Sequence, residues 1–75
     1  MYKYKIKVME ELSKKGYTRP RLRKEKILSE GTMQRLKNNE SVTLETLNIV
    51  CLILRKQLNE VIEIVPTDEE KIKYF

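Results

Sequence analysis

The chain has 75 residues, with 16 lysines and arginines against 11 acidic residues, which gives a formal net charge of +5. A chain of this length forms one domain around one core, and a second domain is excluded. With 40% hydrophobic residues and few glycines and prolines, the composition is typical of a folded globular protein and not of a disordered one.

One cysteine, Cys51, and no histidine exclude an intrachain disulfide and an ordinary Cys/His zinc site. No cofactor is expected, and a buried hydrophobic role for Cys51 is favoured over a nucleophilic one because no histidine is present to activate its thiol. Residues 1–7 lack the apolar stretch of a signal peptide or membrane span. These features together predict a cytoplasmic protein.

Positive charge is concentrated in residues 14–37, which hold nine basic and two acidic residues, a local charge of +7 that leaves −2 for the rest of the chain. Such a segment attracts polyanions such as DNA, RNA or an anionic membrane. The alternative is an ordinary solvated face. No broad apolar face accompanies the cations, which argues against a membrane-surface helix, and most aromatic residues lie near the ends of the chain, which argues against stacking on RNA bases.

Residues 2–8 alternate apolar side chains with lysines, a pattern that fits a short half-buried strand or the approach to a helix. From Ile6, apolar residues recur at helical spacing through Met9 and Leu12, and Gly16 supplies a stop. We therefore expect a first helix that ends near residue 15, with strand and helix competing for residues 2–8.

A second helix is expected from about residue 19 to residue 26, with Thr18 as its N-cap and Pro20 tolerated in the first turn. It buries little beyond Leu22. Its other positions carry an outward set of cations: Arg19, Arg21, Arg23, Lys24 and Lys26. Ile27 and Leu28 form an apolar turn.

Ser29 is the expected N-cap of a third helix that buries Met33 and Leu36. Asn38 and Asn39, which tolerate left-handed backbone angles, close it. The opposite face is polar and holds Glu30, Gly31, Gln34 and Arg35.

Thr43 caps a fourth and most apolar helix, expected to form the core through Leu44, Leu47, Cys51 and Leu54, with Ile49, Val50, Leu52 and Ile53 around this stripe. One helical turn near residues 58–61 and a short strand at 62–65 follow, ended by Pro66. Thr67 opens a capping-box pattern, so residues 67–75 either add a short helix, fray or fold onto a partner.

Two short capped helices joined by a tight turn form a helix-turn-helix candidate. The run Tyr17-Thr18, Leu22, Leu28-Ser29, Thr32-Met33, Leu36 and Asn38, continued by Leu44, Leu47, Cys51, Leu54 and residues 61–66, resembles the small single-domain branch of the Cro/repressor-type (Xre-like, lambda-repressor-like) family. The resemblance covers residues 6–66. It implies an all-α, compact five-helix DNA-binding domain over residues 1–66, here with possible terminal strands and a tail at 67–75.

Two positions depart from the family pattern, which usually has alanine where this chain has Arg23 and a turn glycine where it has Ile27. A residue other than glycine in the turn must avoid or tolerate left-handed angles, so the departure concerns docking geometry and not the fold.

The resemblance also implies site residues. Ser29 and Thr32 match positions that cap the third helix and contact phosphate, Arg19 matches a phosphate contact, and Glu30, Gly31 and Arg35 fall where bases are read. By side-chain chemistry, Arg35 pairs with guanine, Gln34 with adenine and Glu30 with cytosine. The predicted DNA-binding set is Thr18, Arg19, Arg21, Ser29, Glu30, Thr32, Gln34, Arg35, Lys37 and Asn38.

The resulting prediction is a sequence-specific transcriptional regulator, with a recognition helix at about residues 29–38 in the major groove of double-stranded DNA. The alternative is a protein-interaction module of the antitoxin or anti-repressor type on the same fold, for which Gly31, Arg23 and Ile27 are the motivation. An enzyme is not expected, because histidine and a phosphate-binding glycine loop are both missing. A homodimer is predicted, joined through residues 2–8, 62–65 or 72–75.

Overall fold

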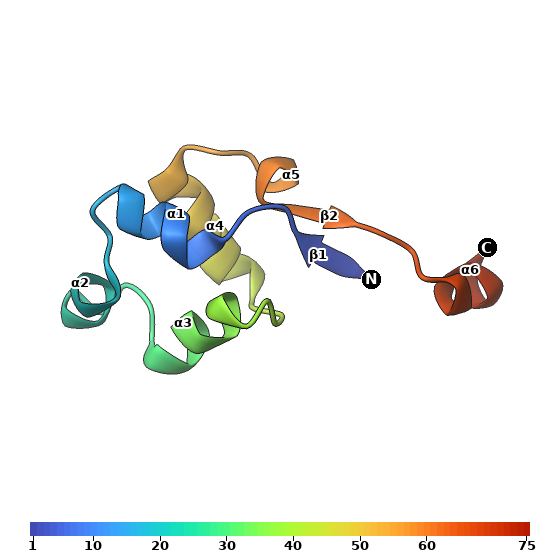
Figure 1. Ribbon diagram of the computed structural model, residues 1–75, viewed down its shortest axis with the longest axis horizontal. Helices are drawn as coiled ribbons and strands as arrows, with labels where there is room; N and C mark the ends of the chain where they lie inside the picture. Colours follow the sequence, from blue (N-terminus) through green and yellow to red (C-terminus); the bar gives the residue numbers. More distant parts are fainter.

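The computed structural model describes all 75 residues. Its elements run in the order β1 (Tyr2–Tyr4), α1 (Val8–Lys14), α2 (Arg19–Lys24), α3 (Glu30–Lys37), α4 (Leu44–Leu54), α5 (Leu58–Val61), β2 (Ile62–Ile64) and α6 (Asp68–Tyr74). Helices α1 to α5 gather into one body, and α6 lies apart from it at the far end of β2 (Figure 1). The predicted all-helical fold with five helices and short terminal strands is confirmed, and a sixth helix forms in the tail.

The core consists of ten buried side chains, all of them apolar, contributed by every helix of the body. The most enclosed include Leu12 of α1, Leu22 of α2 and Met33 of α3, each with no exposed surface. As predicted, α2 buries only Leu22, and α3 buries only Met33 and Leu36, while their other residues are exposed or, at Arg19 and Thr32, half-buried. Helices α2 and α3 are therefore held against the core through one face, and their opposite face is exposed to solvent.

Residues 2–8 are divided between a strand and a helix. β1 pairs antiparallel with β2, with Tyr2 opposite Ile64 and Tyr4 opposite Ile62. Helix α1 begins at Val8, later than the expected position at Ile6, because the chain first completes this pairing: the Lys5 N–H donates to the Val61 carbonyl at 2.8 Å. The predicted strand at 62–65 is confirmed over Ile62–Ile64.

Three helices end with the same pair of backbone hydrogen bonds around a residue in the left-handed conformation. After α1 this residue is Gly16, with φ of 87°, after α2 it is Lys26 with φ of 55°, and after α3 it is Asn39 with φ of 59°. In each case the following N–H donates five residues back, as from Ile27 to the Leu22 carbonyl at 2.9 Å. The stops at Gly16 and Asn39 confirm the sequence analysis.

The end of α2 corrects two expectations. The helix stops at Lys24 and not at residue 26, because Lys26 turns left-handed and cannot continue it. Ile27 was expected to avoid or tolerate left-handed angles, and it avoids them, since Lys26 takes that conformation in its place. The turn between α2 and α3 thus forms without a glycine.

Helix α4 corrects part of the predicted core. Leu47, Val50 and Leu54 are buried, whereas Leu44 is 73% exposed and Leu52 is 69% exposed. Leu44 is the first residue of the helix, where no neighbouring element covers it, and Leu52 lies two residues from Val50 and so on the opposite face. Cys51, expected to be buried, is half-buried, and its partial burial raises the pKa of the thiol.

The C-terminal helix α6 forms from the predicted capping box, in which Thr67 Oγ1 accepts from the Glu70 N–H at 3.1 Å and Glu70 accepts from the Thr67 N–H at 2.9 Å. Glu70 also pairs with the Met1 ammonium group, and this hydrogen bond is the main reason that the pKa of its carboxyl falls to about 2. None of the residues of α6 is buried.

Candidate nucleic-acid interface

The N-caps that frame α2 and α3 are those expected. Thr18 Oγ1 accepts a hydrogen bond from the Arg21 N–H at 3.5 Å, and Ser29 Oγ accepts one from the Thr32 N–H at 3.2 Å. Ser29 also donates to the Thr32 hydroxyl at 2.9 Å. Both predicted phosphate-contact residues of α3, Ser29 and Thr32, thus lie together at the N-terminal end of the helix, where the helix dipole favours negative charge.

The outer face of α3 is polar and open to solvent. Exposed positions on it include Glu30, Gly31, Gln34 and Arg35, while Met33 and Leu36 point into the core. A Cβ atom added to Gly31 would meet nothing within 4 Å, and the residue has ordinary helical angles. Nothing inside the molecule requires glycine here, so its lack of a side chain affects only what approaches from outside.

Three of the predicted site residues bind one another across the gap between α2 and α3. Arg19 donates through Nε and Nη2 to Glu30 Oε2 at 3.2 and 3.1 Å. Its Nη2 also donates to Gln34 Oε1 at 3.1 Å. Arg23 completes the cluster, with Nη1 placed 2.9 Å from Glu30 Oε1. One carboxylate therefore pairs with two arginines, and cancels one of their two positive charges, on the face that was predicted to bind DNA.

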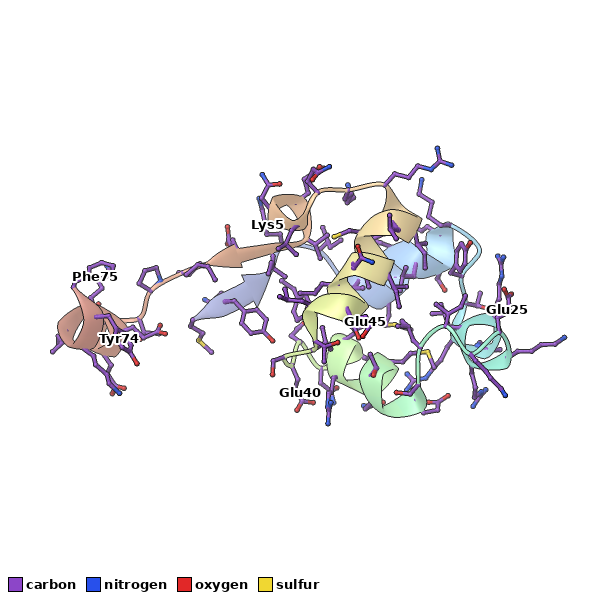
Figure 2. The ribbon with its side chains drawn as sticks, turned by 180° about the vertical axis from the view of Figure 1, so that it is seen from behind. Lys5, Glu25, Glu40, Glu45, Tyr74 and Phe75 are labelled. Atoms are coloured by element: carbon purple, nitrogen blue, oxygen red, sulfur yellow. The ribbon has the colours of Figure 1, made fainter.

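Arg21 is engaged within the N-terminal part of the domain. Its Nε donates to Glu25 at 2.7 Å, its Nη1 donates to the Gly16 carbonyl at 3.2 Å, and its guanidinium lies 4.2 Å from the centre of the Tyr17 ring. The hydrogen bond to Glu25, which stands just after α2 (Figure 2), raises the pKa of Arg21 above its usual value. These contacts hold the turn from α1 to α2 in shape.

Five cations of the basic segment have no acidic partner within ion-pair distance: Lys15, Lys24, Lys26, Arg35 and Lys37. Lys37 also lines a shallow groove with Ser13 and Lys14 of α1 and with Arg19. Lys14 was predicted as a member of the basic segment but not as a neighbour of α3. That proximity results from the packing of α1 against α3, for which the sequence gives no local signal.

Asn38 is the C-cap of α3, with φ of −88°, and its side-chain amide donates to Glu40 at 3.4 Å. The loop that follows is held from the other side of the molecule, since the Tyr4 hydroxyl donates to the Glu40 carbonyl at 2.8 Å. Burial, with a smaller effect of Tyr2, raises the pKa of Tyr4 to about 12. The C-terminal end of α3 is therefore anchored to the small sheet.

A helix packed through one face, preceded by a short helix and a tight turn and lined outside by polar side chains, defines a helix-turn-helix protein. The sequence model of the family described as Cro/C1-type HTH DNA-binding domain matches residues 7–67. The chain belongs to this family, as the sequence resemblance predicted. Comparison of the chain with curated proteins and with solved structures found no match.

No helix has the length and apolar character needed to cross a lipid bilayer. No group of three or more histidine, cysteine or acidic side chains is placed to bind a metal ion.

Proposed function

We propose that the protein is a sequence-specific, DNA-binding transcriptional regulator of the cytoplasm without enzymatic activity. The recognition helix is α3 together with its caps Ser29 and Asn38, and it enters the major groove of double-stranded DNA. The observation that carries this proposal is the exposed polar face of α3 in a Cro/C1-type domain, with the unpaired cations Arg35 and Lys37 on the same helix. A helix in the major groove reads bases with such a face, while nearby cations bind phosphates.

Within this face, Arg35 is the residue to which we assign the main contact with a base. Its side chain is exposed and makes no hydrogen bond or ion pair within the protein, so the guanidinium is free for a bidentate contact with guanine. Gln34 and Glu30 are engaged by Arg19 in the free protein and must exchange these contacts to reach adenine or cytosine. Gly31 lets the backbone of α3 come close to the floor of the groove.

Phosphate contacts are assigned to the edges of this face. Ser29 and Thr32 sit at the start of α3, and Lys37 and Asn38 sit at its end, so together they bracket the reading positions. Thr18 and Arg19 extend the contact surface to the start of α2. Arg21 remains a member of the proposed set, although it must give up Glu25 to bind phosphate.

The domain proper is proposed to span residues 1–66, with residues 67–75 as a tail, since no residue of α6 contributes to the core. Proteins of this type read palindromic sites as homodimers whose recognition helices lie about 34 Å apart. We propose a homodimer here as well.

The test is selection of binding sites from a random duplex library at about 150 mM salt, where non-specific complexes are weak. The expected result is an enriched inverted repeat. Arg35→Ala should lose the preference at one base pair of each half-site, while Lys3→Ala, which removes an exposed cation on β1, should leave the selected motif unchanged. Absence of any enriched motif would refute sequence-specific binding.

The second candidate is the protein-interaction module of the antitoxin or anti-repressor type. The pairing of Arg19 and Arg23 with Glu30 favours it, because the carboxylate lowers by one the positive charge that the α2–α3 face offers to DNA. Salt distinguishes the two functions. Binding to DNA weakens with a slope of about −0.9 in log K against log salt for each neutralised phosphate, whereas an apolar protein interface changes little.

A further inference from the structure

A hydrogen bond from Arg19 fixes the orientation of the Gln34 side chain on the outer face of α3. Arg19 Nη2 donates to Gln34 Oε1 at 3.1 Å. A guanidinium group has hydrogen-bond donors and no acceptor, so it can hold only the carbonyl end of the amide. Gln34 is otherwise exposed, and its Nε2 amino group makes no hydrogen bond within the protein. The donor end of the amide is therefore the end that is free to meet a base.

Arg19 is itself held in place by Glu30. Its Nε and Nη2 both donate to Glu30 Oε2, at 3.2 and 3.1 Å, and the other carboxylate oxygen lies 2.9 Å from Arg23 Nη1. Nη2 thus divides its two hydrogens between Glu30 and Gln34, while Nη1 of Arg19 makes no hydrogen bond within the protein. Arg19 can therefore contact a phosphate through Nη1 without releasing Gln34.

Every side-chain acceptor among these residues is engaged by an arginine, namely both oxygens of Glu30 and the carbonyl oxygen of Gln34. We infer that Arg19 determines base specificity, by making Gln34 read guanine and not adenine. Adenine needs a donor and an acceptor from a glutamine, whereas the major-groove edge of guanine offers two acceptors, N7 and O6. Gln34 Oε1 keeps a second lone pair, but the adjacent guanidinium charge repels the amino hydrogens of adenine.

This inference rests on the proposed function and changes two roles that side-chain chemistry alone predicted. Gln34 was expected to bind adenine, and Glu30 was expected to bind cytosine. In the structure Glu30 positions Arg19, and Arg19 positions Gln34. Arg19 thus acts on base selection through Gln34 and not through its own contact with a base.

The experiment is selection of binding sites from a random duplex library with the wild-type chain and its variants. Gln34→Ala identifies the base pair that Gln34 reads, because the preference disappears there. At this position the wild-type chain should prefer guanine over adenine by at least about fivefold. Arg19→Met keeps the aliphatic part of the side chain but frees the amide of Gln34, so the preference should change to adenine.

The matched control is Arg23→Met, which removes the same charge from α2 and a partner of the same carboxylate, but no contact with Gln34. Loss of a cation should weaken binding by both methionine variants, and only Arg19→Met should change the preferred base. Neither position lies in the core, so far-UV circular dichroism should show that both variants fold.

Gln34→Glu tests the same arrangement in the opposite direction. One carboxylate oxygen can still accept from Arg19, and the other replaces the free donor by an acceptor, so the preference should change to cytosine, which donates through N4. Retention of guanine by Gln34→Glu would overturn the inference.

The inference is also overturned by adenine at this position in the wild-type motif, by a Gln34→Ala motif identical to that of the wild type, or by Arg19→Met and Arg23→Met acting alike on the preferred base. Each of these results leaves sequence-specific binding intact. A library with no enriched motif refutes the proposed function and the inference together, so the two failures are distinguishable.

Discussion

The cluster of Arg19, Arg23 and Glu30 restrains the basic face, and Glu30→Gln tests its effect on DNA binding. The substitution keeps the shape of the side chain but removes the charge that pairs with both arginines. In the free protein the arginines then lose their competitor for phosphate, and in the complex a carboxylate no longer repels the DNA backbone. Both effects increase the affinity for duplex DNA of random sequence.

The magnitude follows from the exposure of the three side chains, which is 32% for Arg19, 46% for Glu30 and 60% for Arg23. Ion pairs exposed to this degree contribute about 0.2–1 kcal/mol each. Two pairs released together correspond to about 0.4–2 kcal/mol, and solvent screening favours the lower half of that range. We expect a random duplex to bind about 2- to 10-fold more tightly, because 1.4 kcal/mol is a factor of about ten in Kd.

Fluorescence anisotropy with a random-sequence duplex, measured over a series of salt concentrations, checks this prediction. The matched control is Glu63→Gln on β2, which changes the net charge equally but lies in the small sheet and has no ion-pair partner. The slope against salt should steepen for Glu30→Gln by up to about 0.9 for each phosphate newly neutralised. Equal effects of the two variants, or weaker binding by Glu30→Gln, would show that Glu30 does not restrain binding of the basic face to DNA.

Three further predictions concern the scaffold. Lys26→Gly should raise the free energy of unfolding by about 0.5–1 kcal/mol in urea titrations, because glycine occupies the left-handed position without strain. Ile27→Gly should not raise it. Equal gains in the two variants would contradict the assignment of the left-handed position to Lys26. Leu22→Ala should cost about 2–5 kcal/mol, since the side chain is fully buried, and a loss below about 1 kcal/mol would show that α2 is not fixed through Leu22. The pKa of Tyr4 is about 12 in the folded protein, so its contribution to stability is complete below the ordinary pKa of about 10 and is lost as the pH rises towards 12. Tyr4→Phe should remove the highest step of the phenolate absorbance titration. Persistence of this step in the variant would assign it to another tyrosine.

Local features were predicted well because their causes are local. Thr18, Ser29 and Thr43 were identified as caps from a hydroxyl at the start of an expected helix, and Thr67 was identified from its capping-box pattern. Each of the four accepts the expected hydrogen bond. The inward residues of α3 also followed from helical periodicity. A cap needs only residues within one turn, so sequence order is sufficient to find it.

Features that depend on distant neighbours could not be predicted in the same way. The division of residues 2–8 into strand and helix depends on pairing with β2, which lies more than 50 residues away in the chain. The exposure of Leu44 and Leu52 depends on which faces of α4 the other helices cover. The helical pattern of the sequence predicted the spacing of the apolar residues along α4, but not how much of the surface of this helix the other helices cover.

The residues of the candidate DNA-binding face were predicted from the sequence, but the hydrogen bonds and ion pairs among them were not. Glu30 and Gln34 were assigned to bases, and Arg19 to phosphate, as independent side chains. In the structure all three are joined, because the turn at Lys26 brings the start of α2 against the start of α3. Arg19 and Glu30 stand 11 residues apart, beyond any spacing that one helix would bring together.

Contact between the outer face of α3 and DNA can be tested by mapping amide chemical shifts during titration of the protein with a duplex. We expect the largest changes on residues 29–38, including the unobstructed Gly31, with smaller changes at the start of α2 and none on α6. Changes concentrated on α6, or around the exposed Leu44 and Leu52 of α4 with α3 unaffected, would contradict it.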